Sequence, residues 1–101
     1  MPKPINFKAL NSQLLVNSCT LVPSWLPNGR LERQEWVALN PTRGDKNLGS
    51  FRVNLKTGRW GDFATGDKGG DLVSLYAYVK GISQGSSAKE LIRIIGERHD
   101  R

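Results

Sequence analysis

Basic side chains and a tryptophan gather in one short stretch of this chain, residues 49–71, which reads GSFRVNLKTGRWGDFATGDKGGD. Trp60 lies among four cations of this stretch: Arg52, Lys56, Arg59 and Lys68. Lysine and arginine bind phosphates because each neutralised phosphate releases counterions. An exposed indole ring stacks on an unpaired base, a contact worth about 1–3 kcal/mol. These residue types predict a small nucleic-acid-binding ribbon and not an enzyme active site.

The positive charge of the chain is concentrated in the same region. The formal net charge is +6, and the segment from Arg43 to Arg59 holds five basic residues and one acid, Asp45. Clustered cations attract polyanions. The expected phosphate contacts and the basic rim around them are Arg43, Lys46, Arg52, Lys56, Arg59 and Lys68. On charge alone, a solvated basic face without a partner explains the same pattern.

A predicted β-hairpin must position these cations. Phe51, Val53 and Leu55 alternate with polar residues, which is the period-two pattern of a half-buried strand. A loop at 56–58 leads into a second short strand at 59–63. Alternation leaves the exposed face of that strand open. An outward Trp60 stacks on a base, whereas an inward Trp60 belongs to the core and leaves the cations to act alone.

The glycine-rich loop from Gly66 to Asp71 invites interpretation as a phosphate cradle, since glycine lets backbone amides approach an anion at a helix start. The Gly-Lys-Ser/Thr element of a nucleotide-binding P-loop is missing. Asp71 can satisfy the same amides itself as a helix cap. A turn followed by a cap is therefore the favoured interpretation.

Catalytic and metal sites find little support in the sequence. The four aspartates of this region, which could be imagined around Mg²⁺, are Asp45, Asp62, Asp67 and Asp71. They lack a matching histidine, and aspartate is common in turns. Cys19 and His99 are each the single residue of their type, too few for a zinc site or a Ser-His-Asp triad. We expect no catalytic residue, no metal and no cofactor.

The rest of the chain supplies helices around the hairpin. Asn6 is the expected cap of an amphipathic helix over 6–17, and prolines predict an irregular segment over 19–29. Short strands are expected at 30–33 and 35–39, and a loop over 40–45. Asp71 opens a helix that ends at Gly81, and Ser87 with Glu90 has the spacing of a capping box for a last helix closed by Gly96. The predicted fold is α+β: a small antiparallel sheet packed with an N-terminal helix and two C-terminal helices.

Length and composition are those of one domain. A chain of 101 residues forms one modest core, here expected over 1–101, with residues 1–34 as a leading segment, 35–96 as the core and 97–101 as a frayed tail. No apolar run approaches the roughly 18 residues of a membrane span, and the N-terminus lacks the apolar core of a secretion signal. We expect a cytoplasmic protein without a membrane partner.

Residues 35–96 resemble a known family. The run GSFRVNLKTGRW, then GGDLVSLYAYVKG, then AKELIRIIG is similar to the zinc-ribbon domain at the N-terminus of bacterial and phage DNA primases. Gly49-Ser50-Phe51 matches the Pro-Ser-Phe step of that family, and Gly70-Asp71 matches its Gly-Asp helix start. The two ligand regions of the family correspond to 40–46 and 61–65, and neither holds Cys or His. The resemblance implies a zinc-free relative, as in primase or primase-helicase proteins of phages and mobile elements, whose sheet face handles single-stranded DNA.

The sequence therefore predicts a non-catalytic nucleic-acid-binding module, with single-stranded DNA favoured, in a mobile-element or phage replication system. The alternative is a protein-protein adaptor that docks on a primase, helicase or polymerase. In that case exposed aromatic residues would anchor the interface, and the positive charge would aid solubility.

Overall fold

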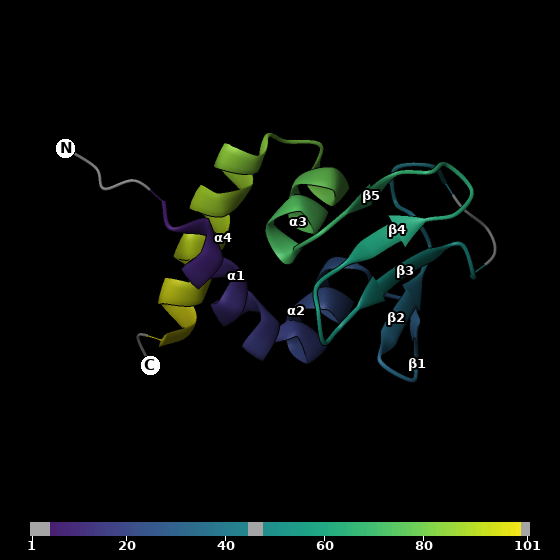
Figure 1. Ribbon diagram of the computed structural model, residues 1–101, viewed down its shortest axis with the longest axis horizontal. Coiled ribbons are helices and arrows are strands. Elements are labelled where there is room, and N and C mark those ends of the chain that lie inside the picture. Colours follow the sequence, from purple (N-terminus) through teal and green to yellow (C-terminus); the bar gives the residue numbers. More distant parts are fainter. Residues whose placement is uncertain (1–4, 45–47, 100–101) are drawn as a thin grey trace.

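The computed structural model describes residues 5–44 and 48–99, with side chains as far as residue 96. Within these residues the elements are α1 (Phe7–Val16), α2 (Ser18–Trp25), β1 (Arg30–Glu32), β2 (Glu35–Ala38), β3 (Phe51–Asn54), β4 (Trp60–Asp62), β5 (Lys68–Gly69), α3 (Leu72–Lys80) and α4 (Gln84–His99). The sheet occupies one end of the molecule and α1 with α4 the other, with α3 between them (Figure 1). The predicted α+β class is confirmed.

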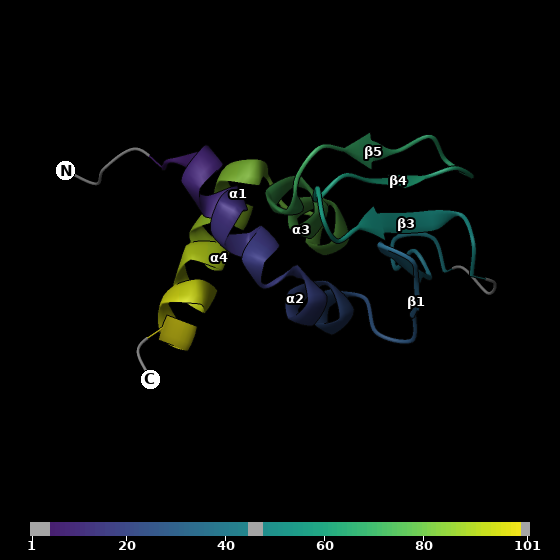
Figure 2. The same ribbon diagram turned by 60° about the horizontal axis from the view of Figure 1, so that its bottom comes forward.

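The five strands form one antiparallel sheet in the order β1-β2-β3-β4-β5. Each strand therefore pairs with its neighbour in the sequence, as short connections favour. Residues directly opposite one another share a face of the sheet. Val53 pairs with both Trp36 and Trp60, and these three residues lie on the face that we call inner. Figure 2 shows the strands β3, β4 and β5 side by side, with α3 at one end of them.

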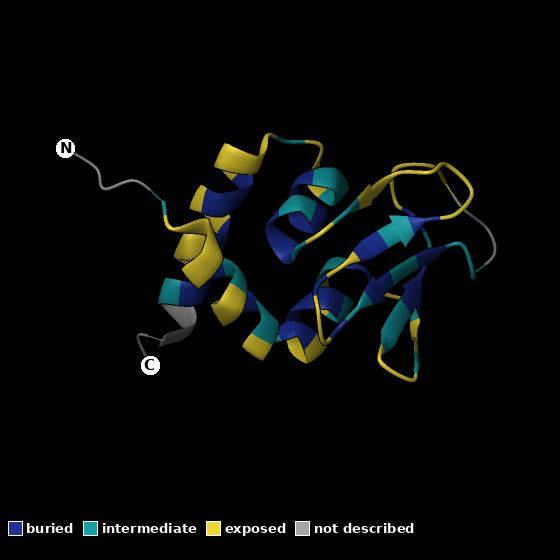
Figure 3. Cartoon of the chain, viewed as in Figure 1, coloured by how far each residue is buried: buried dark blue, intermediate teal, exposed yellow. Residues whose placement is uncertain are grey.

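The core forms where the inner face meets α2 and α3. Phe51 and Val53 of β3 are fully buried, and so are Leu72 and Leu75 of α3 to within 1% of their surface. On the α2 side, the Ser18 hydroxyl donates to the Leu55 carbonyl at 2.6 Å. In Figure 3 parts of β3, β4, α2 and α3 are coloured as buried, whereas the loop after β4 is exposed. The opposite face of β3–β5 has no described helix over it.

The segment after Cys19 is a helix, contrary to the predicted irregular structure. α2 contains Pro23 and is only 8 residues long. Its buried residues follow helical spacing, with Ser18, Leu21 and Val22 inside and Leu26 just beyond the helix end. Proline removes one hydrogen bond, and the burial of this apolar stripe outweighs that loss.

The predicted helix ends are confirmed at Asn6, Asp71 and Gly81. The Asn6 side chain accepts from the Ala9 amide at 3.0 Å, and Asp71 accepts from the Ser74 amide at 2.8 Å. Gly81 ends α3 in the left-handed region, at φ 68°. The Ser87 capping box is wrong, because α4 begins at Gln84 and Ser87 is buried within it. There the Ser87 hydroxyl donates to the Val73 carbonyl at 2.8 Å.

Two further boundaries differ from the prediction. Lys68–Gly69, expected within a loop, form the edge strand β5 beside β4. α4 continues past Gly96 as far as His99, so the helix extends into the predicted tail. In the described part of the chain, no helix combines the length and the apolar character that a bilayer crossing requires.

Candidate nucleic-acid interface

The face of the sheet that points away from α3 carries the predicted cations of β3 and β5. Arg52 pairs with Gly61 on β4, and Gly61 pairs with Lys68 on β5. These three residues form one cross-strand row, with a glycine between two basic residues. Asn54 shares this face two positions along β3, and its amide donates to the Arg59 carbonyl at 2.7 Å. Arg52, Arg59 and Lys68 thus belong to one surface, as the sequence predicted.

A shallow depression runs over this surface, and we call it the outer groove. Its lining residues are Glu35, Arg52, Asn54, Thr57, Arg59, Trp60, Gly61, Asp62, Phe63, Gly66, Asp67 and Lys68. Arg59, Gly61 and Phe63 occupy alternate positions of the chain, with Gly61 inside β4 and the other two directly flanking that strand. Cations, a position without a side chain and an aromatic ring therefore line one continuous surface.

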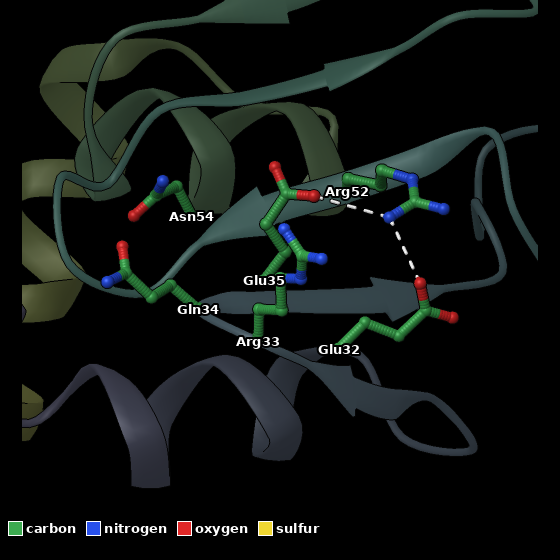
Figure 4. Close-up of a pocket in the computed structure, with 6 residues that line it drawn as sticks. All are labelled: Glu32, Arg33, Gln34, Glu35, Arg52 and Asn54. Carbon is green, nitrogen blue, oxygen red and sulfur yellow. Dashed lines mark hydrogen bonds and ion pairs between the residues drawn. The ribbon is translucent and has the colours of Figure 1, made fainter.

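Arg52 is held by carboxylates of the neighbouring hairpin. Its guanidinium nitrogen Nη1 lies 3.2 Å from Glu35 and 3.3 Å from Glu32, and Nε donates to the Gly49 carbonyl at 3.0 Å. Figure 4 shows Arg52 reaching between these two glutamates. A hydrogen bond from Arg30, together with the charges of Arg30 and Arg52, keeps the pKa of Glu32 below its ordinary value despite some desolvation. The charge of Arg52 is therefore balanced by two carboxylates, and its contact with a phosphate stays a prediction.

Arg43 is also committed to a carboxylate. Its Nε lies 3.1 Å from Asp62, whose side chain is 0% exposed. Asn40 donates to the same Asp62 oxygen at 2.7 Å and to the Tyr78 hydroxyl at 2.9 Å. The Ala64 amide donates to the other Asp62 oxygen at 2.8 Å. We call Asn40, Arg43 and Asp62 the loop clamp, since it joins the loop after β2 to the end of β4. The predicted rim role of Arg43 gives way to this structural one.

Ionisation of Asp62 is favoured in spite of its burial. Desolvation is the largest single influence and raises its pKa. Hydrogen bonds from Asn40, the Ala64 amide and Ser50, with the charge of Arg43, together outweigh it and leave the pKa of Asp62 below its ordinary value. The clamp is therefore built around a carboxylate anion and not a carboxylic acid.

Trp60 belongs to the core, so a stacking role for its ring is excluded. The residue is 7% exposed, and its ring centroid lies 4.7 Å from that of Tyr78. Its indole N–H donates to the Ser74 hydroxyl at 3.0 Å. Of the two alternatives left open by the sequence, the inward one holds. Gly69, opposite Trp60 on β5, leaves the room that the indole ring occupies.

Three of the predicted cations remain available. Lys56, Arg59 and Lys68 are exposed, and within residues 5–44 and 48–96 they have no ion-pair partner. Arg59 and Lys68 line the outer groove, and Lys56 lies in the turn before it. Lys46 lies outside the described residues.

Sequence reasoning missed two residues of this surface. Phe63 is 82% exposed and lines the outer groove. Arg33, in the β1–β2 turn at φ 57°, lines an adjoining depression that shares Glu35, Arg52 and Asn54 with the groove. Alternation along β4 contained the signal for Phe63, because an inward Trp60 sends Gly61 and Phe63 to the other face.

The described aspartates of the imagined Mg²⁺ site form hydrogen bonds or ion pairs with other groups of the protein. Asp62 lies in the loop clamp, Asp71 caps α3, and Asp67 accepts a hydrogen bond of 2.8 Å from the Tyr78 hydroxyl. The favoured turn-and-cap interpretation of the glycine-rich loop is confirmed at Asp71. Asp45 lies outside the described residues. Among those that the structure describes, no three His, Cys, Asp or Glu residues gather as a metal site would require.

Comparison of this chain with protein-family models, with curated proteins and with solved structures finds no match. The geometry of the sheet face is therefore the basis for assigning a function.

Proposed function

We propose that this domain binds nucleic acid, with single-stranded DNA as the expected ligand, on the outer groove of its sheet. It acts as a binding module without catalysis of its own. Arg59 and Lys68 contact phosphates from either side of Gly61, and Lys56 adds charge at the turn. The observation that carries the proposal is the presence of unpaired cations and an exposed aromatic ring in one groove.

Charge pairing across the groove supports this assignment. Glu35 is paired with Arg52, and Asp62 is buried against Arg43. Asp67 is exposed and accepts a hydrogen bond from the Tyr78 hydroxyl. The groups left to attract a ligand are thus Arg59 and Lys68, with Lys56 close by, against one carboxylate. Unpaired surface cations of this kind bind phosphates with little sequence preference.

The resemblance to primase zinc ribbons extends the proposal to a biological setting. The loop clamp joins Asn40 and Arg43 to Asp62, within the two segments where that family carries its metal ligands. A buried carboxylate that receives several hydrogen bonds and an ion pair from the other loop can hold the two loops together. We therefore propose a metal-free relative of that family, serving a primase-type replication system of a phage or mobile element in the cytoplasm.

A salt titration tests the proposal. Binding of a labelled single-stranded oligonucleotide is measured by fluorescence anisotropy over a range of salt concentrations, for the natural chain and for Arg59→Gln/Lys68→Gln. The double variant should bind more weakly, and the slope of log K against log salt should flatten by about 0.7 per lost phosphate contact. Lys89→Gln is the control, because Lys89 is an exposed cation on α4, at the end of the molecule away from the sheet (Figure 1).

Either of two results would refute the proposal. One is binding that does not respond to salt, and the other is equal weakening by Lys89→Gln and by the groove variant. An adaptor that docks on a replication protein would capture that partner equally well with or without Arg59 and Lys68.

A further inference from the structure

We infer that Phe63 is a stacking platform for one unpaired base, and that the outer groove therefore selects single-stranded DNA over duplex. This inference rests on the proposed function and assigns the residue that recognises the ligand. Phe63 is exposed to 82% of its surface, whereas Phe51 and Trp60, the neighbouring aromatic residues of the sheet, are 0% and 7% exposed.

The backbone at Phe63 is fixed before any ligand arrives. Its amide donates to the Ser50 carbonyl at 2.9 Å, which continues the pairing of β4 with the chain before β3. The next amide, that of Ala64, donates to the buried Asp62 carboxylate at 2.8 Å. The loop clamp therefore anchors the turn that presents the ring. A ring on a rigid backbone loses little conformational freedom when a base stacks on it.

Gly61 leaves space beside this ring. A methyl group placed at Gly61 would meet the Asp67 carbonyl oxygen and the Lys68 Cβ at 3.6 Å, which is ordinary van der Waals contact. Packing therefore does not require glycine here, in contrast to Gly69, where the same methyl group would lie 2.4 Å from the Trp60 nitrogen. The missing side chain instead opens the floor of the groove between Arg59, Lys68 and Phe63.

These features fit a single strand. The faces of bases in a duplex are covered by their neighbours, so an aromatic side chain reaches them only after costly unstacking. In a single strand a base is free to stack on a protein ring while adjacent phosphates lie near cations. The outer groove offers both kinds of contact, with the Phe63 ring for a base and Arg59 and Lys68 for phosphates.

The test compares the natural chain with Phe63→Ala, Phe63→Trp and Gly61→Thr, by anisotropy with a labelled oligothymidylate and with a duplex of equal length. Phe63→Ala should weaken single-strand binding by between about 5-fold and about 150-fold, the range for loss of one stacked base. The salt slope should not change, because no cation is lost. Phe63→Trp should restore binding, and Gly61→Thr should weaken it by filling the groove. A 2-aminopurine in the oligonucleotide reports the stacking directly.

Leu31→Ala is the control, because Leu31 is an apolar side chain 60% exposed at the sheet edge and outside the groove. It should change affinity by less than about 2-fold, because it removes neither a cation nor a ring from the outer groove. If Phe63→Ala binds as well as the natural chain while Arg59→Gln/Lys68→Gln does not, the stacking inference fails and the proposed function stands. If neither variant weakens binding, both fail. If the natural chain binds the duplex as tightly as the oligothymidylate, the inferred selectivity for single-stranded DNA is wrong.

Discussion

The Asn40 amide donates a hydrogen bond of 2.7 Å to the Asp62 carboxylate, across 22 positions of the sequence. Both residues are at least 98% buried. This contact ties the loop that follows β2 to the end of β4, the strand whose outward residues line the outer groove. A polar group buried this completely is stabilising only while its partner is present. The contact therefore makes the local fold depend on the carboxylate.

The first prediction concerns the stability of the loop clamp. Asp62→Ala removes the buried carboxylate that accepts from the Asn40 amide and the Ala64 N–H and pairs with Arg43, so it should lower the free energy of unfolding by about 2–4 kcal/mol. Urea denaturation followed by tryptophan fluorescence measures this loss. Asp67→Ala is the matched control. Asp67 is exposed and accepts one hydrogen bond, so its removal should cost less than about 1 kcal/mol. Equal costs for the two variants would contradict the clamp.

The second prediction follows from the lowered pKa of Asp62. The unfolded chain has an ordinary aspartate pKa of about 3.9, and the folded chain a lower one. The stabilising effect of the Asp62 charge is therefore complete above about pH 4 and decreases as the pH falls through the folded pKa. The difference in unfolding free energy between the natural chain and Asp62→Ala should shrink below that pH. Urea titrations at a series of acidic pH values measure the difference. A difference that grows or stays constant as the pH falls would contradict a lowered pKa for Asp62 in the folded chain.

Local patterns in the sequence were enough to predict the α+β class and much of the sheet. The alternation at Phe51, Val53 and Leu55 gave the correct buried face of β3, because one face of an antiparallel strand packs on the core. The caps at Asn6 and Asp71 were predictable because each bonds within one turn of its own helix. These features depend on neighbours in the sequence and needed no knowledge of the tertiary fold.

Other features depend on contacts between distant residues. The direction of Trp60 is set by Ser74 and Tyr78 of α3, which alternation along β4 alone does not reveal. The pairing of Arg43 with Asp62 and of Arg52 with two glutamates requires the registers of β1 to β4. A count of cations along the sequence therefore overestimates the charge available to a ligand. Phe63 was overlooked as a site residue for the same reason, since its exposure follows from the inward position of Trp60.

The third prediction tests the packing of Trp60. A methyl group at Gly69 would lie 2.4 Å from the Trp60 nitrogen and 2.5 Å from the Ser74 hydroxyl. The indole ring has little room to move, since Phe51 and Tyr78 pack against it. Gly69→Ala should therefore destabilise the domain by about 1–3 kcal/mol, as overpacked cores do. Gly70→Ala is the control, because no atom lies within 4 Å of its added methyl group. Thermal or urea unfolding compares the stability of Gly69→Ala with that of Gly70→Ala. An unchanged stability of Gly69→Ala would contradict the close packing of the Trp60 indole against Gly69.

The last prediction concerns the carboxylates that hold Arg52. Glu32 and Glu35 lie 3.3 and 3.2 Å from its guanidinium, and both are partly exposed. Glu32→Gln/Glu35→Gln should change stability by less than about 1 kcal/mol, because exposed ion pairs contribute little. It should also release Arg52 toward the outer groove and remove two negative charges from its edge. Single-stranded DNA should then bind about 5-fold more tightly, and the salt slope should steepen by about 0.7 as Arg52 gains a phosphate. Glu90→Gln, which removes a carboxylate from α4, should leave both quantities unchanged; a steeper slope for it too would mean that net charge, and not Arg52, governs the binding.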